Sequence, residues 1–117
     1  MNIEEIRTYC LSKKGVTEEF PFDETTLVYK VMGKIFLLTD LVSELSINVK
    51  CDPLKAIELR EQYRCVVPGY HMNKKHWNTV HMDGSVPDRL IRDWIDHSYE
   101  QVATKLSGKL KEQLKRL

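Results

Sequence analysis

The dipeptide Met32-Gly33 constrains the fold of this chain more than any other feature. It stands between two runs rich in β-branched and other apolar residues, 27–31 and 34–39. A two-residue connection that ends in glycine is typical of a tight β-hairpin, because glycine readily adopts the positive φ that such turns need. We therefore expect the two runs to form adjacent antiparallel strands.

Residues 45–50 are expected to form a third strand. Apolar residues occupy every second position in this segment, with Leu45, Ile47 and Val49 separated by polar side chains. Successive side chains of a strand point to opposite faces, so this pattern places the apolar set on one face. It indicates an antiparallel sheet with one covered face.

Two further short strands are predicted at residues 64–67 and 76–82, and Asp83-Gly84 follows them as a turn. Residues 16–26 are predicted to be a loop, because Pro21 and the Asp and Thr residues after it interrupt both the helical and the strand period. The chain is thus expected to have five strands.

Capping residues and apolar stripes predict three main helices. Asn2 is a good cap for the first, Asp52-Pro53 places a cap and a first-turn proline at the second, and Ser85 or Pro87 begins the third. The apolar stripes assigned to these helices are Ile3, Ile6, Cys10 and Leu11; Leu54, Ile57 and residues 59–63; and Leu90, Ile91, Trp94, Ile95, Ser98 and Val102.

The predicted element order is α-β-β-β-α-β-β-α. Because consecutive strands fall into hairpins, it indicates an α+β fold, an antiparallel five-stranded sheet with helices on one face. The 117 residues suit a single domain, 1–117, and residues 105–117 are expected to be a frayed or extended basic C-terminal helix.

Composition favours a cytoplasmic protein. The hydrophobic content of 42% and charged content of 30% are those of a globular chain, and the net charge is only +1. Cys10, Cys51 and Cys65 form no CxxC pattern and are expected to be reduced, buried thiols. The acidic amino terminus does not resemble a signal peptide, and no apolar run spans a bilayer, so we expect no membrane partner. We also expect the protein to be a monomer.

The segment 68–84, PGYHMNKKHWNTVHMDG, is the strongest candidate for a functional region. It contains three of the four histidines and two adjacent lysines, and its first carboxylate is Asp83. A locally cationic loop can attract anions even when the net charge of the protein is close to zero.

A metal site is not expected in this segment. His76 and His81 are five positions apart in a predicted strand, so their side chains point to opposite faces. His71 could reach either, but three histidines without a nearby Cys or carboxylate form a weak ligand set. We therefore predict no metal ion and no other cofactor.

Catalytic residues are not expected either. The chain lacks a phosphate-binding glycine loop, a GxSxG elbow and an HExxH motif. Cys65 could form a nucleophile pair with any of the histidines, but its neighbours Val66 and Val67 favour a buried, unreactive thiol.

Binding of nucleic acid or another anion is the function that these residues favour. Lysines can hold phosphates or carboxylates, and polar and aromatic side chains can add hydrogen bonds and stacking. Asn73 is expected to shape the turn through its tolerance of left-handed backbone, and Trp77 to be buried against the last helix near Trp94. The residues predicted to bind nucleic acid or an anion are Arg64, Tyr70, His71, Asn73, Lys74, Lys75 and His76.

Several motifs in order along the chain resemble those of the MmcQ/YjbR-like family of small bacterial proteins. They are PGYHMNKKHW at 68–77, TVHMDGSVPDRLI at 79–91, SYEQV at 98–102 and YKVMGKIFLL at 29–38. The resemblance implies a CyaY-like fold, also described as a double-wing arrangement and proposed on its shape to bind DNA. The Leu- and Lys-rich tail after Gly108 departs from the common core of the family.

The overall expectation is a non-enzymatic cytoplasmic binding module, with DNA as the first partner to test. A protein-protein interaction module without a nucleic-acid role, with an acidic protein as its partner, is the alternative. An uncharacterised enzyme is the third. The tail carries leucines at helical spacing among basic residues, which suits an acidic partner, a second copy of the chain or a membrane surface, or simply a frayed helix.

Overall fold

The hairpin predicted at Met32-Gly33 joins the second and third strands of a six-stranded sheet. The structure is a computed structural model that describes residues 1–70 and 72–117. Met32 and Gly33 have φ of 49° and 84°, as a type I′ turn requires. The elements of the described residues are α1 Ile3–Leu11, β1 Val16–Glu19, β2 Thr26–Val31, β3 Lys34–Asp40, β4 Ser46–Lys50, α2 Pro53–Gln62, β5 Val66–Pro68, β6 Trp77–His81, α3 Asp88–Ala103 and α4 Gly108–Lys115.

The sheet is antiparallel throughout and has the strand order β1-β2-β3-β4-β6-β5. The α+β class is confirmed, but the prediction of five strands was wrong, because β1 lies in the segment predicted to be a loop. Tertiary contacts hold this polar strand in place. It pairs with β2, and Glu18 accepts hydrogen bonds from the hydroxyl of Tyr29 and from Nε of Arg7, at 2.8 and 2.9 Å.

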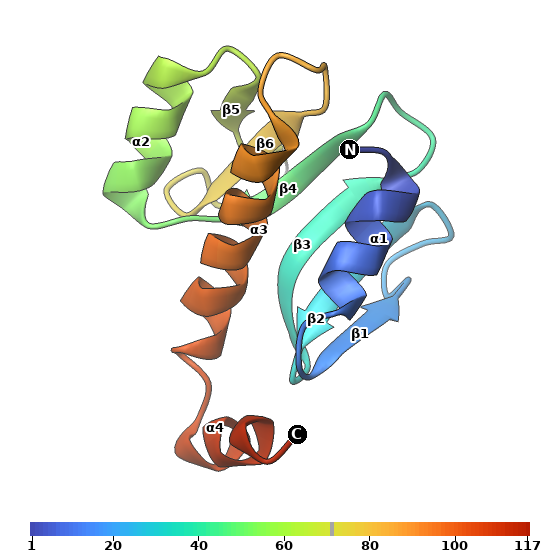
Figure 1. Ribbon diagram of the computed structural model, residues 1–117, viewed down its shortest axis with the longest axis vertical. Coiled ribbons are helices and arrows are strands. Elements are labelled where there is room, and N and C mark those ends of the chain that lie inside the picture. The colour runs from blue at the N-terminus through green and yellow to red at the C-terminus, as the bar shows by residue number, and fades with distance from the viewer. Residues whose placement is uncertain (71) are drawn as a thin grey trace.

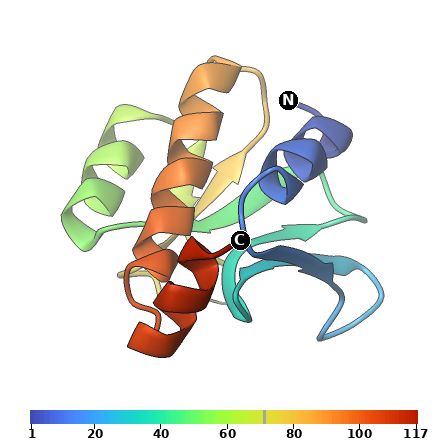
Figure 2. The same ribbon diagram turned by 60° about the horizontal axis from the view of Figure 1, so that its bottom comes forward.

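The helices α1, α2 and α3 lie on one side of the sheet, and α4 crosses below the end of α3 (Figures 1 and 2). The main core is between these helices and the sheet, and the predicted apolar stripe of α3 faces it. Ile91, Trp94, Ile95 and Val102 of this stripe are buried there. The alternation that predicted β4 is confirmed too, since Ile47 and Val49 are buried in the same core.

The predicted apolar side of α2 is confirmed at Leu59 and Tyr63, which pack against the main core, but was wrong for the first part of the helix. Leu54 and Ile57 are 74% and 49% exposed, and the buried residue of this helix is Ala56. A small side chain there lets the helix backbone approach β6, where Nδ2 of Asn78 donates to the carbonyl oxygen of Ala56 at 3.4 Å. The predicted start is confirmed, with Asp52 as the cap and Pro53 in the first turn.

The basic tail, predicted to be a frayed or extended helix, forms the short helix α4, which packs on the domain and adds a fourth helix to the three main ones in the described residues. Leu106, which precedes α4, is buried. Leu114 is partly buried and packs beside Gly15 and Met32, at the turns that precede β1 and follow β2. Leu117 at the end of the chain is exposed.

Candidate functional site

The face of the sheet away from the helices carries a second, smaller apolar cluster. Trp77 packs there with Val28 and Leu38. Trp77 is buried, as predicted, with 9% of its surface exposed, but the prediction that it lies near Trp94 was wrong. Alternation along β6 sends Val80 into the helix-side core and Trp77 to the opposite face, so the two tryptophans are on opposite sides of the sheet.

Beside this cluster lies the largest hollow described for the molecule, with a volume of about 580 Å³. This is within the range of roughly 300–1,000 Å³ that is usual for ligand pockets. We call it the open-face hollow. The residues that line it are Phe22, Thr26, Leu38, Thr39, Asp40, Ser43, Glu44, Ser46, Asn48, Tyr70, Met72 and His81.

A short chain of hydrogen bonds organises the floor of the open-face hollow. The hydroxyl of Thr79 donates to Oδ1 of Asn48 at 2.5 Å and accepts from the backbone N–H of Tyr70 at 3.1 Å. These bonds tie the segment after β5 to the centre of the sheet. They also orient the side-chain amide of Asn48. Its Nδ2 donates to no group in the described part of the chain, so this N–H donor is available to a ligand.

Carboxylates line one end of the hollow. Asp40 is at the end of β3, where its side chain accepts from the backbone N–H of Val42 at 3.0 Å and from the hydroxyl of Ser43 at 2.8 Å. These bonds lower the pKa of Asp40 below its usual range, so the group is ionised at neutral pH. Glu44 follows in the same loop, and His81 approaches from β6, where it is paired with Ser46.

Exposed apolar side chains lie on the rim of the hollow and next to its acidic end. Phe22 and Tyr70, on the rim of the hollow, are 66% and 60% exposed. Leu41 and Val42 are also exposed, and the N–H of Leu41 bonds to the carbonyl oxygen of Thr25, which places the loops before β2 and after β3 together. A cluster of this kind around a hollow is typical of an interaction surface.

The predicted binding loop lies beside this hollow, and Tyr70 is the predicted residue that also lines it. Lys74, Lys75 and Asn73 are exposed, His76 is half-buried, and Arg64 is exposed at the turn before β5. His71 lies outside the described residues. Met72, which sequence reasoning did not select, lines the hollow instead.

Asn73 shapes the turn, but by a different mechanism from the one predicted. Its side chain accepts from the backbone N–H of Lys75 at 2.9 Å, and its carbonyl oxygen accepts from His76 and Trp77. Its φ is not positive: apart from glycines, Met32 alone has a positive φ in the described ranges. A side-chain hydrogen bond of this type can close a turn without left-handed backbone.

Arg60 anchors this loop, and sequence reasoning missed it. Its Nε donates to Oδ1 of Asn78 at 2.6 Å, and its Nη2 donates to the carbonyl oxygens of Trp77, at 3.2 Å, and of Lys74. Gly69 is fixed in the same place, since a Cβ there would lie 2.9 Å from Cβ of Trp77. The only local signal was a basic residue in the last turn of a helix, which more often reflects the helix dipole.

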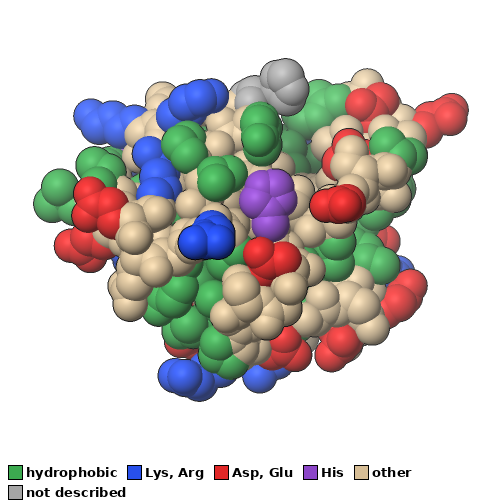
Figure 3. All heavy atoms as spheres, turned by 90° about the horizontal axis from the view of Figure 1, so that it is seen from above, with side chains coloured by type: hydrophobic (Ala, Val, Ile, Leu, Met, Phe, Trp, Pro, Cys, Tyr) green, Lys and Arg blue, Asp and Glu red, His purple; other side chains and the backbone are tan. Residues whose placement is uncertain are grey.

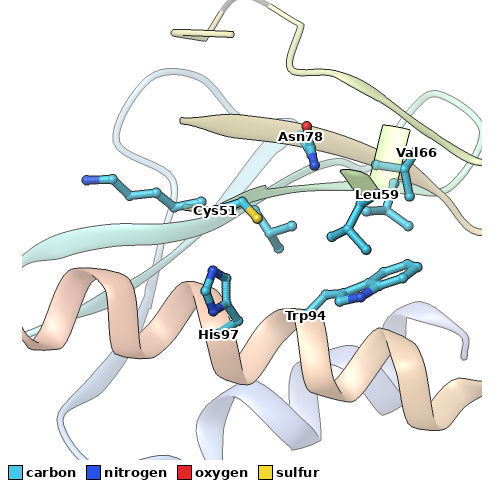
Figure 4. A pocket seen from close by; sticks show the side chains of 9 residues that line it. Cys51, Leu59, Val66, Asn78, Trp94 and His97 are labelled. Atoms are coloured by element: carbon cyan, nitrogen blue, oxygen red, sulfur yellow. The ribbon is translucent and has the colours of Figure 1, made fainter. Parts of the chain in front are cut away.

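A second cavity, between α3 and the sheet, brings Cys51 and His97 together with Leu59, Val66, Asn78 and Trp94 (Figure 4). Its volume is about 10 Å³, room for one water molecule at most. Burial raises the pKa of the Cys51 thiol to about 11, so the thiolate needed for nucleophilic attack is scarce at neutral pH. The Cys51 thiol is therefore poorly suited to act as a nucleophile.

Neither a metal site nor a membrane span is present in residues 1–70 and 72–117. No group of three or more His, Cys, Asp or Glu side chains there is placed to hold a metal ion. None of the helices in the same ranges is long and apolar enough to cross a membrane. The three cysteines are free and buried.

The charges on this part of the surface are segregated. Seen from above, the side away from the helices runs along the upper edge of Figure 3. Lys and Arg side chains gather at its left and carboxylates at its right, with exposed hydrophobic side chains between them. Basic and acidic side chains therefore gather in separate regions along this edge.

Fold and site define a small α+β domain with one helix-covered sheet face and one open, hollowed face. The family model YjbR matches residues 11–101. The chain belongs to the YjbR family, which confirms the resemblance found in its motifs. YjbR of Escherichia coli K12 is 33% identical over 118 residues and covers all of both chains. YbdF of E. coli O157:H7 is 39% identical over 89 residues, 75% of this chain and 73% of its own.

Solved structures agree with the fold. Protein DR2400 of Deinococcus radiodurans, described as a DUF419 domain, has a TM-score of 0.90 and 37% identity, and the match covers 97% of this chain and 87% of DR2400. A protein from Pseudomonas syringae has a TM-score of 0.73 at 24% identity, over 84% of this chain and 96% of its own. The second likeness concerns the fold alone.

Proposed function

We propose that this chain is a binding module and that its open-face hollow receives a short segment of a partner protein carrying a basic side chain between apolar ones. The observation that carries the proposal is the combination, in one hollow, of the carboxylates of Asp40 and Glu44 with the exposed rings of Phe22 and Tyr70. We also propose that it acts in the cytoplasm, in keeping with its three free thiols.

Charge and exposed area together favour a protein segment over a small molecule. A basic side chain would meet the ionised Asp40 at one end of the hollow, where charge complementarity gives specificity. The apolar side chains beside it would cover Phe22 and Tyr70, and further along the rim Leu41 and Val42, which a ligand confined to the hollow would leave exposed. Aromatic anchors of this kind supply most of the energy of many interfaces.

A titration with defined peptides tests the proposal. The probes are a short synthetic peptide of leucine, phenylalanine and arginine and the same peptide with glutamate for arginine, followed by amide chemical shifts of the labelled protein. We expect the basic peptide to shift Asn48, Thr79 and His81 saturably and the acidic one not to. Tyr70→Ala should weaken binding about tenfold, as loss of an aromatic anchor does, whereas Ile57→Ala, an exposed apolar residue on α2, should not.

Equal binding of the two peptides, or shifts confined to residues outside the hollow, would contradict the proposal. Glu44→Gln adds a second check. It should weaken the basic peptide and reduce the dependence of binding on salt, because it removes one attracting charge. Glu58→Gln on the exposed side of α2 is the matched control.

DNA is a second candidate partner, for the basic loop and not for the hollow. Supporting it are Arg64, Lys74 and Lys75, which are exposed and form no ion pair with a carboxylate of the described residues. The double-wing, CyaY-like arrangement implied by the resemblance supports the same candidate. Against it, Asp40 and Glu44 border the same surface and would repel a duplex laid across it.

Titrations with two kinds of anion, at two salt concentrations, test the possible partners of the loop. Duplex and single-stranded DNA are titrated at two salt concentrations, with a polyglutamate peptide in place of an acidic protein surface. Phosphate contacts release counterions, so the affinity for DNA should fall steeply as salt rises. Binding of polyglutamate without binding of DNA would favour an acidic protein partner, and no binding of either at low salt would remove the loop as an anion site.

A further inference from the structure

A second, smaller hollow lies at the other end of β3 from the open-face hollow, where β3 begins and α3 ends. It has a volume of about 240 Å³ and is lined by Lys34, Ile35, Lys50, Val102, Lys105 and Leu106. We call it the three-lysine hollow. These residues come from β3, from β4 and from the end of α3 with the turn after it.

The charge of this hollow is unbalanced. Three of its six lining residues are lysines, and none is a carboxylate. Of the other partly exposed lysines, Lys13 pairs with Asp96 at 2.5 Å and Lys30 with Glu19 at 3.4 Å, while Lys55 forms no ion pair within the described residues. Lys50 is also only partly exposed, yet it forms no ion pair within the described residues.

Lys50 is held in a setting that opposes its charge. Burial lowers the pKa of Lys50, and the charge of Lys105 lowers it further. Both effects disfavour the ammonium form, and an anion placed between the two lysines would offset them by adding a favourable charge interaction with each. An anion would therefore bind there without first breaking an ion pair.

The other half of the hollow is aliphatic. Val102 and Leu106 are buried with 6% of their surface exposed, and the half-buried Ile35, which also packs against the cluster around Trp77, lines the same hollow. An inorganic anion would contact only the lysine head groups, and not Ile35 or the small exposed part of Val102 and Leu106. A ligand that satisfies both halves needs an aliphatic chain as well as a negative charge.

From this arrangement we propose that the three-lysine hollow binds a small amphiphile, an aliphatic chain that ends in an anionic head group. The head group, a carboxylate or a phosphate, lies among Lys34, Lys50 and Lys105, and the chain lies on Ile35, Val102 and Leu106. Lysine is suited to such a head group because its compact ammonium can approach an oxygen anion from many directions. The site is independent of the open-face hollow, so either proposal can fail without the other.

The test is a titration of the full chain with four probes, followed by amide and methyl chemical shifts. Octanoate and octyl phosphate carry both halves of the ligand, inorganic phosphate carries the charge alone, and 1-octanol carries the chain alone. The amphiphiles are kept below the concentrations at which they form micelles. Lys50→Met keeps the aliphatic stem and removes the charge, and Lys109→Met, in α4 and outside the hollow, is the matched control.

We expect saturable shifts at Ile35, Val102 and Leu106 with octanoate or octyl phosphate, and the tighter of the two identifies the head group. Lys50→Met should weaken that binding about tenfold, the effect of losing one charge-assisted contact, while Lys109→Met leaves it unchanged. The absence of saturable shifts with both amphiphiles would overturn the proposal. So would equal affinity for 1-octanol or inorganic phosphate, or equal binding by the two folded variants, whose thermal unfolding is measured in parallel.

Discussion

The two faces of the sheet carry similar strand patterns but have different environments. On the helix side, Ile47, Val49 and Val80 are sealed under α3 and belong to the main core. On the open side, Trp77, Val28 and Leu38 form a small cluster next to a hollow lined by polar and charged side chains. Alternation along the strands therefore supplies apolar residues to both faces of the sheet. The helices that pack on one face make it the core, and the face without helices can bind a ligand.

The two tryptophans give the largest expected effect, since each is buried on a different face. Trp94 is 4% exposed and packs edge-on against Tyr63, with ring centroids 5.2 Å apart, so Trp94→Ala should cost roughly 3–5 kcal/mol of unfolding free energy. Trp77→Ala should cost less, about 3 kcal/mol, because the space left opens toward solvent. Urea unfolding measures both, and a larger loss at Trp77 would mean that the open-face cluster, and not the helix-side core, dominates stability.

Ser98 links α3 to the sheet and should give the next largest effect. Its hydroxyl donates to the carbonyl oxygen of Phe36 at 2.5 Å and accepts from the N–H of Lys50 at 2.8 Å. Ser98→Ala leaves both buried backbone groups without that partner, at a cost of roughly 1–3 kcal/mol. Thr104→Ala, an exposed hydroxyl at the end of the same helix, should cost under about 0.5 kcal/mol. Equal losses in the two variants would show that the helix-covered face does not depend on this contact.

His97 makes the helix-covered face sensitive to pH. Its Nε2 accepts from the backbone N–H of Asp52 at 3.1 Å, which requires that nitrogen to be unprotonated. Burial, and then the charge of Lys55, lower the pKa of His97 below 6.5, against the opposing charges of Asp52 and Glu100. The unfolded state therefore takes up the proton first, and the stability that His97 contributes is full above pH 6.5 and is lost as pH falls toward its lower folded pKa.

Urea unfolding of the wild type and His97→Gln between pH 8 and pH 5 measures this contribution, because glutamine can still accept the Asp52 hydrogen bond but does not titrate. The wild type should lose more stability than the variant as the pH falls. Parallel curves would place the pH dependence in other groups.

The smallest effect on stability is expected at the basic loop. Lys74 and Lys75 are exposed, and within the described residues the Lys74 side chain makes one long hydrogen bond, 3.3 Å from its Nζ to the carbonyl oxygen of Gly69. The double replacement by Ala should change unfolding free energy by less than about 0.5 kcal/mol and should weaken any anionic ligand of the loop. If instead the protein failed to fold, the lysines would belong to the scaffold.

The assignment of site residues was partly within reach of sequence reasoning. The loop 68–77 and its exposed tyrosine and lysines could be selected from composition alone, since cationic, aromatic and turn-forming residues are adjacent in the chain. The open-face hollow could not, because Phe22, Asp40, Asn48 and His81 come from four separate segments. Arg60 was missed for the same reason, as its partners Lys74, Trp77 and Asn78 lie in another element.

Local chemistry in the sequence determined the hairpin at Met32-Gly33, the start of α2 at Asp52-Pro53 and the core-facing stripe of α3. Each depends on neighbouring residues, through a φ requirement, a cap or a helical period. Only the tertiary structure decided that Val16–Glu19 is a strand, that Trp77 faces away from Trp94, and that Leu54 and Ile57 stay exposed. Those outcomes depend on which element packs on which face, and a period of two or 3.6 residues carries no information about the partner.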